Sequence, residues 1–100
     1  MNSEEVVNAY IGEAGNPWAV EIRKEELKVR LSREWNDLRI GGIEIFLLPE
    51  GAVITAGIIN PAGLIEGFTG GEAVPEAEIL PTILRHQCNL EYIHEATRLY

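Results

Sequence analysis

The stretch that decides the fold reads IEIFLLPEGAVITAGII and runs from Ile43 to Ile59. Its first six residues alternate between two largely apolar faces, which is the period of a β-strand. The sequence Pro49-Glu50-Gly51 then has the composition of a turn. The eight residues from Ala52 to Ile59 carry no charge and are rich in β-branched side chains, which is typical of a central strand. We therefore predict a β-hairpin at the centre of an antiparallel sheet.

Working outward from this hairpin, further strands are predicted on both sides. The four residues 60–63, Asn-Pro-Ala-Gly, form a turn, and a short strand over 64–69 follows it. The whole region 40–69 is thus predicted to be an antiparallel meander. Upstream, apolar and other side chains alternate over residues 18–23, which indicates another strand with one buried face.

The segment 24–38 fits two structures. Apolar side chains at every second position from Leu27 to Leu31 predict a strand over 26–33. The same segment also has apolar residues at helical spacing, which are Leu27, Leu31, Trp35 and Leu38. We favour the strand, with a turn after it, and keep a helix across 24–38 as the alternative.

Helices are predicted at both ends of the chain. Ser3 can cap a helix over residues 3–13, where the first turn holds two acids and glycines end it. Residues 72–78 are expected to form a loop or helix entry. Beyond them the apolar side chains recur at helical spacing, but the earlier and the later ones fall on different faces of the helix. This difference predicts either one helix packed on two elements or a pair of helices broken near Asn89.

The chain is expected to be a single α+β domain over residues 1–100. Its arrangement is an N-terminal helix, an antiparallel meander of four to five strands, and a C-terminal helix or broken helix pair. The apolar and charged fractions, 46% and 24%, are ordinary for a folded domain. No apolar run is long enough to span a membrane, and the N-terminus lacks signal-peptide features. With Cys88 as the only cysteine, which we expect to be buried or half-buried, we predict a cytoplasmic protein.

Charge is distributed unevenly along the chain. The net charge is −8, yet residues 23–39 hold six of the eight basic side chains. Residues 40–84 contain six acids and no Lys or Arg. An acidic chain repels phosphates, so direct binding of nucleic acid or an anionic membrane is not expected. The charge favours a basic protein partner instead.

No catalytic or metal-binding constellation is evident in the sequence. His86 and Cys88 lie two residues apart, so on a helix they point in nearly opposite directions. Cys88 and His94 also fall on different faces. The acids are almost all Glu, and no Cys/His quartet exists, so neither a calcium loop nor a zinc site is predicted. We expect no cofactor and no metal.

We therefore predict a non-enzymatic protein-interaction module: a small acidic regulator, adaptor or inhibitor of a larger complex. An acidic inhibitor that mimics nucleic acid is one form of this prediction, and self-association into a homodimer is another. The interaction residues are expected in the acidic part of the chain, at Glu66, Glu72, Glu76 and Glu78. The alternative is a small-molecule-binding or catalytic domain with a site near His86, Cys88 and His94.

Overall fold

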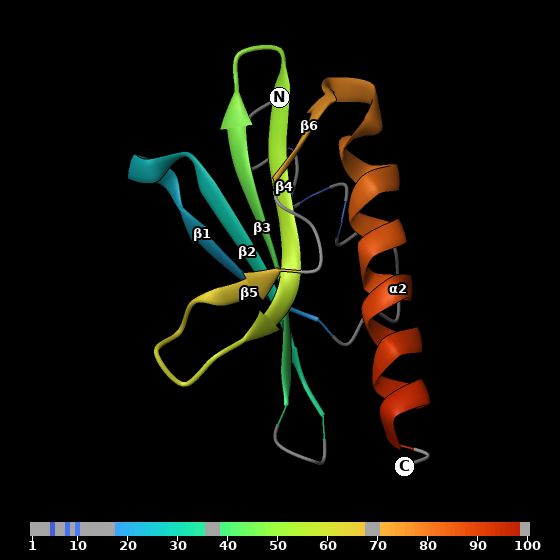
Figure 1. The fold of residues 1–100 in the computed structure, drawn as a ribbon. Helices are drawn as coiled ribbons and strands as arrows, with labels where there is room; N and C mark the ends of the chain where they lie inside the picture. Colours follow the sequence, from blue (N-terminus) through green and yellow to red (C-terminus); the bar gives the residue numbers. More distant parts are fainter. Residues whose placement is uncertain are drawn as a thin grey trace.

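The chain folds into a six-stranded antiparallel sheet with one long C-terminal helix packed against it (Figure 1). The computed structural model describes residues 5, 8, 10, 18–35, 39–67 and 71–98. The α+β class predicted from the sequence is confirmed. In chain order the elements are β1 (Ala19–Arg23), η1 (Lys24–Glu26), β2 (Lys28–Glu34), β3 (Ile40–Leu48), β4 (Gly51–Ile59), β5 (Ile65–Gly67), β6 (Glu72–Pro75), η2 (Glu76–Glu78) and α2 (Ile79–Arg98).

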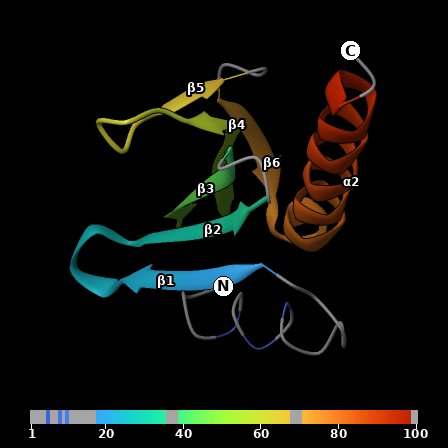
Figure 2. The same ribbon diagram turned by 90° about the horizontal axis from the view of Figure 1, so that it is seen from below.

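The strands β1 to β5 are neighbours in the order of the sequence, so the predicted meander is confirmed. They follow a curve, with α2 to one side of them (Figure 2). One edge of strand β4 pairs with β3, and its other edge pairs with two short strands. Its residues 57–59 pair with β5, and its residues 51–54 pair with β6. The sequence had predicted a loop where β6 lies, because four residues that include Glu72 and Pro75 carry too little β-strand signal.

In its described part, the ambiguous segment 24–38 contains the short 3-10 helix η1 followed by the strand β2, so it does not form the alternative helix across 24–38. The deciding factor is Val29, which lies off the helical stripe but is fully buried in the sheet together with Leu31. Beyond β2, Trp35 packs edge-to-face on Trp18, with the ring centroids 6.1 Å apart. Gly41 makes room for this packing, because a Cβ atom there would lie 2.6 Å from the Trp35 ring.

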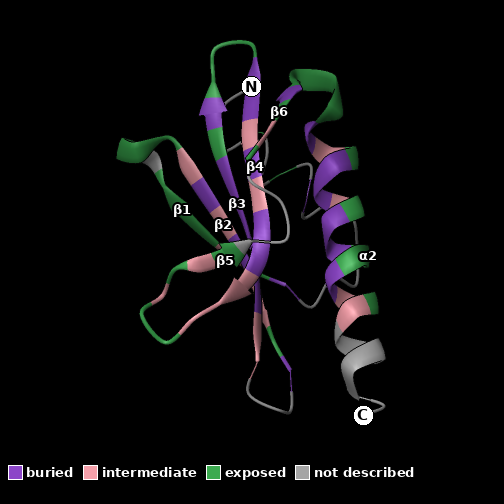
Figure 3. Cartoon of the chain, viewed as in Figure 1, coloured by how far each residue is buried: buried purple, intermediate pink, exposed green. Residues whose placement is uncertain are grey.

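Alternation along the strands gives the sheet two different faces. The inner face packs toward α2, and the core lies between them (Figure 3). The helix contributes Ile79, Ile83 and Leu90 to this core. The sheet contributes side chains that are almost wholly buried, namely Val29, Leu31, Ile43, Ile45 and Ile54. Each such burial stabilises the fold by roughly 1.5–3 kcal/mol before the cost in conformational entropy.

The C-terminal helix α2 is continuous over Ile79–Arg98, so of the two predicted alternatives the single helix is confirmed, and there is no break near Asn89. The helix keeps one face toward the sheet, with His86, Gln87 and Leu90 buried. Two residues on the other face of the helix are exposed: Tyr92, and Cys88, which was expected to be buried or half-buried. None of the helices in the described part of the chain is both long and apolar enough to cross a membrane.

The helix predicted over residues 3–13 lies mostly outside the described residues; the three that are described, Glu5, Asn8 and Tyr10, are helical. Tyr10 is described and is buried. Gln87 Nε2 donates a hydrogen bond of 2.8 Å to the Tyr10 hydroxyl, which ties this N-terminal residue to α2. Burial raises the pKa of the Tyr10 phenol to about 12, because the charged form is disfavoured away from water.

Candidate functional site

Two segments far apart in the sequence meet at one end of the sheet. The β3–β4 turn lies beside the junction of β6 and η2 (Figure 1). Gly51 is the register partner of Pro75, and the backbone N–H of Glu76 donates to the carbonyl of Glu50 at 3.3 Å. We call this the acidic end of the molecule and define it by Glu50, Glu76 and Glu78.

The acidic end contains a hollow of about 550 Å³. Glu50 and Gly51 line part of it. The remaining lining is apolar and comes from both segments: Leu48, Pro49, Ala52, Ala73, Val74 and Pro75. Leu48 keeps 45% of its surface exposed, which is high for a leucine beside so many other apolar groups. The volume falls within the range of roughly 300–1,000 Å³ that is typical of ligand pockets.

The segments that form this hollow carry negative charge and no positive charge. Glu50 lines the hollow, and Glu76 and Glu78 follow its lining residue Pro75 in the chain. Glu50, Glu76 and Glu78 are all exposed. The segments that build the acidic end belong to the stretch 40–84, which has no Lys or Arg. The end of the sheet is therefore a largely apolar depression that has Glu50 in its lining and is followed in the chain by the two acids of η2.

The structure separates the four acids that were predicted as interaction residues. Glu76 and Glu78 lie together in η2 at the acidic end. Glu66 lies on β5, opposite Ile58 near the other end of β4, where its side chain accepts a hydrogen bond from Asn60. Glu72 lies on β6, and its carboxylate pairs with a residue of α2. Glu50 was not among the predicted residues of the acidic end. Its place in a turn, within the stretch 40–84 that has no Lys or Arg, was a signal that could have identified it.

The carboxylate of Glu72 connects β6 to the helix. Arg85 Nη2 lies 2.5 Å from Glu72 Oε2, and this hydrogen bond lowers the pKa of the Glu72 carboxyl. His86 Nε2 lies 3.5 Å from the same oxygen. Burial lowers the pKa of the His86 imidazole, and the charge of Arg85 lowers it further, while Glu72 acts in the opposite direction.

His86 and Cys88, two residues of the alternative site, point in different directions. His86 is 4% exposed, and its Nε2 has no hydrogen-bond partner among the described residues. Cys88 is exposed on the other side of α2. The side chain of His94 lies outside the described part of the structure. The described residues thus do not bring a thiol and an imidazole together.

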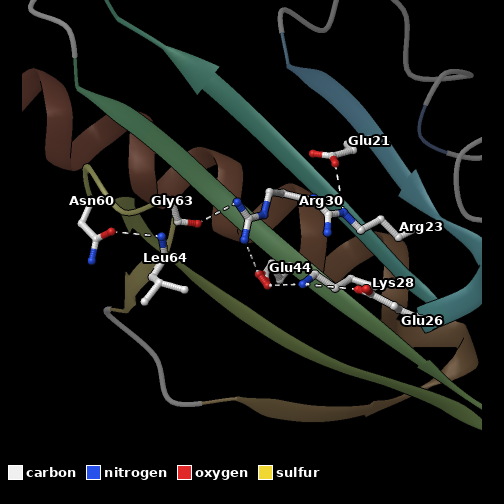
Figure 4. Close-up of polar contacts among 9 residues, drawn as sticks. All are labelled: Glu21, Arg23, Glu26, Lys28, Arg30, Glu44, Asn60, Gly63 and Leu64. Carbon is white, nitrogen blue, oxygen red and sulfur yellow. Dashed lines mark hydrogen bonds and ion pairs between the residues drawn. The ribbon is translucent and has the colours of Figure 1, made fainter.

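The outer face of the sheet, which points away from α2, carries a cluster of ion pairs. Figure 4 views this face, with the helix behind the strands. Glu44 on β3 lies between two basic residues of β2: its Oε2 is 2.9 Å from Arg30 Nη2, and its Oε1 is 3.4 Å from Lys28 Nζ. Arg30 Nη1 also donates to the carbonyl of Gly63 at 2.9 Å, so the β4–β5 loop reaches back across β3.

No protein-family model, curated protein or solved structure matches this chain. In the part of the chain that the structure describes, no three His, Cys, Asp or Glu side chains come together as metal ligands do. The two features with a definite chemical character are therefore the acidic end with its largely apolar hollow and the ion-pair cluster of the outer face.

Proposed function

We propose that this chain is a non-enzymatic protein-interaction module that docks a basic partner at its acidic end. The observation that supports this most strongly is the largely apolar hollow that Glu50 lines, with the exposed acids Glu76 and Glu78 directly after its lining residue Pro75. Because Cys88 is the only cysteine, we place this activity in the cytoplasm.

The partner segment is inferred from the chemistry of the acidic end. An apolar side chain of the partner fills the hollow between Leu48 and Pro75, where it loses contact with water. Lys or Arg residues on either side of that anchor face Glu50, Glu76 and Glu78. Interfaces typically combine such a buried apolar anchor with a polar rim, and the rim charges mainly accelerate and orient the encounter.

A second copy of this chain fits the acidic end less well. A symmetric contact places the same patch of both copies face to face. Glu50, Glu76 and Glu78 would then face their own copies, and like charges repel. The homodimer predicted from the sequence is thus a weaker form of the proposal, and a measurement of the native mass in solution tests it directly.

The proposal is tested by affinity capture from the source cell, followed by mass spectrometry. The bait is the wild-type chain or the variant Glu50→Gln/Glu76→Gln/Glu78→Gln. The control bait, Glu25→Gln/Glu26→Gln/Glu34→Gln, removes the same number of exposed carboxylates from η1 and β2. We expect the wild type and the control to recover a protein with a basic segment, and the variant of the acidic end to lose it.

Two results would overturn the proposal. One is that none of the three baits recovers a partner while the wild-type chain has a monomeric mass. The other is that both triple variants lose the partner equally, since net charge rather than the acidic end would then be responsible. A salt titration of the recovered complex separates two forms of the proposal: a steep loss of affinity favours a nucleic-acid mimic, whereas a shallow loss favours apolar docking with charges only at the rim.

A further inference from the structure

The outer face of the sheet contains a second hollow, separate from the acidic end. Its volume is about 360 Å³. One part of its lining is charged and the other part is apolar. The charged part consists of Lys28, Arg30 and Glu44, and the apolar part includes Phe46, Leu64 and Ile65.

The hollow is formed by the register of β2 against β3 and by one contact from the β4–β5 loop. Lys28 is opposite Phe46, and Arg30 is opposite Glu44, so these four side chains share the outer face of β2 and β3. The β4–β5 loop closes a further side, because its Gly63 carbonyl is held by Arg30. Asn60 Oδ1 accepts the backbone N–H of Leu64 at 3.0 Å, which fixes the loop in this position (Figure 4). The Leu64 side chain is left 63% exposed beside the charged groups.

The charges in the hollow do not balance. Two cations, with side chains only 17% and 22% exposed, share a single buried carboxylate, that of Glu44. The next carboxylate, Glu26, is 3.9 Å from Lys28 and mostly exposed, so water screens it. An acidic chain therefore keeps an excess positive charge in a partly dry hollow, which is costly unless an anion accompanies it.

We propose that this hollow binds a small carboxylate ligand with an apolar body. The carboxylate of the ligand contacts Lys28 Nζ, because the bonds of Arg30 already go to Glu44 and Gly63. The apolar body lies against Phe46, Leu64 and Ile65. The Lys28 ammonium is 5.4 Å from the centroid of the Phe46 ring, so the charged and apolar parts of the ligand have adjacent partners.

The proposal is tested with three probes of one shape, followed by amide chemical shifts in NMR spectra of the full chain. The probes are 3-phenylpropionate, the neutral 3-phenylpropanol and the cationic 3-phenylpropylamine. We expect the carboxylate to bind with a dissociation constant of roughly a millimolar, a value ordinary for about eleven non-hydrogen atoms. The shifts should cluster on β2, β3 and the β4–β5 loop. The alcohol and the amine should each bind at least about fivefold more weakly, because neither supplies an anion.

Two variants of the hollow are expected to change the affinity for the carboxylate in opposite directions. Lys28→Met removes the contact for the carboxylate and should weaken binding about tenfold. Glu44→Gln removes the internal competitor and should strengthen binding severalfold, a change that a merely structural role of Glu44 does not produce. Arg23→Gln is the matched control, because Arg23 pairs with Glu21 outside the hollow, and it should leave binding unchanged. If Lys28→Met does not fold, Lys28→Gln replaces it.

Equal binding of the carboxylate and the alcohol would overturn the proposal, since the hollow would then be only apolar. So would weaker binding of the carboxylate by Glu44→Gln, or the absence of saturable shifts up to about 10 mM of the carboxylate. The outcome does not depend on the acidic end: the variant Glu50→Gln/Glu76→Gln/Glu78→Gln should bind the carboxylate like the wild type.

Discussion

The inner and outer faces of the sheet belong to the same strands but have different chemistry. On the inner face, apolar side chains of β2, β3 and β4 are almost fully buried against α2. On the outer face, the intervening residues of the same strands hold an ion-pair cluster and an exposed phenylalanine, Phe46. The difference shows how one alternating sequence gives a sheet two faces: the inner face supplies the core, and the outer face carries the charged and exposed side chains.

The sharpest contrast between the two faces lies in adjacent residues of β3. Ile45 is 0% exposed on the inner face, whereas Phe46 is 39% exposed on the outer face. We expect Ile45→Ala to lower the free energy of unfolding by about 3 kcal/mol through lost burial and a cavity, and Phe46→Ala to lower it by less than about 1 kcal/mol. Urea denaturation measures both. Equal losses in the two variants would show that the outer face also stabilises the fold. If Ile45→Ala does not fold, Ile45→Val replaces it, with an expected loss of about 1 kcal/mol.

Two glycines sharpen the comparison at the level of the backbone. A Cβ atom on Gly51 would lie 2.1 Å from the carbonyl oxygen of Val74, so Gly51→Ala must displace β6 and disturb the acidic end. We expect a loss of about 2 kcal/mol in the free energy of unfolding. Gly63 has φ +83° but nothing within 4 Å, so Gly63→Ala should cost only about 1 kcal/mol of backbone strain. Thermal unfolding ranks the two variants, and the reverse order would contradict this account of β6.

The pH dependence of stability tests the contact between β6 and α2. The pKa of His86 is lowered in the folded state, so below about pH 6.5 the unfolded chain binds a proton that the folded chain does not. This contribution to stability is present above pH 6.5 and is lost as the pH falls below it. The pKa of Glu72 is also lowered, so its contribution is lost in a more acidic window, below the ordinary carboxyl pKa of 4.5. Urea unfolding should therefore show a smaller loss between pH 7.5 and 5.5 in His86→Gln than in the wild type. A loss of the same size in both would rule out His86 as its source.

The smallest expected effect concerns the ion pair that joins β2 to the helix. Arg33 Nη1 and Trp18 Nε1 both donate to Glu91 Oε1. The side chain of Glu91 is 40% exposed, so water screens the pair. We expect Glu91→Gln to cost only about 0.5 kcal/mol, because the amide oxygen still accepts from Trp18. Chemical denaturation in low and high salt checks this, and a loss above about 2 kcal/mol would show that the pair is central to the docking of α2.

The sequence predicted the meander because its strands carry their own local signals. In β3 and β4 the alternation, the β-branched residues and the turn at Pro49-Glu50-Gly51 all agree, and the structure confirms them. The sequence of β2 fits both the period of a strand and the period of a helix, and only the burial of Val29 in the sheet decides between them. Strand β6 was missed because it depends on pairing with β4 and has almost no signal of its own.

The candidate site was less predictable, because it arises from contacts between distant segments. Glu76 and Glu78 were predicted as interaction residues from the acidic segment that contains them, but the contact of Glu76 with Glu50 depends on the pairing of β6 with β4. Likewise, Arg30 of β2 and Gly63 of the β4–β5 loop are 33 residues apart in the sequence, and only the fold brings them into contact. A position-by-position pattern contains neither of these contacts.

The salt dependence of binding between the captured partner and this chain tests the central claim most directly. We predict that the affinity of the wild type falls as salt is raised, and that this dependence is much smaller in Glu50→Gln/Glu76→Gln/Glu78→Gln. The control Glu25→Gln/Glu26→Gln/Glu34→Gln should retain the wild-type dependence. If the variant of the acidic end shows the same affinity and the same salt dependence as the wild type, the acidic end is not the docking site.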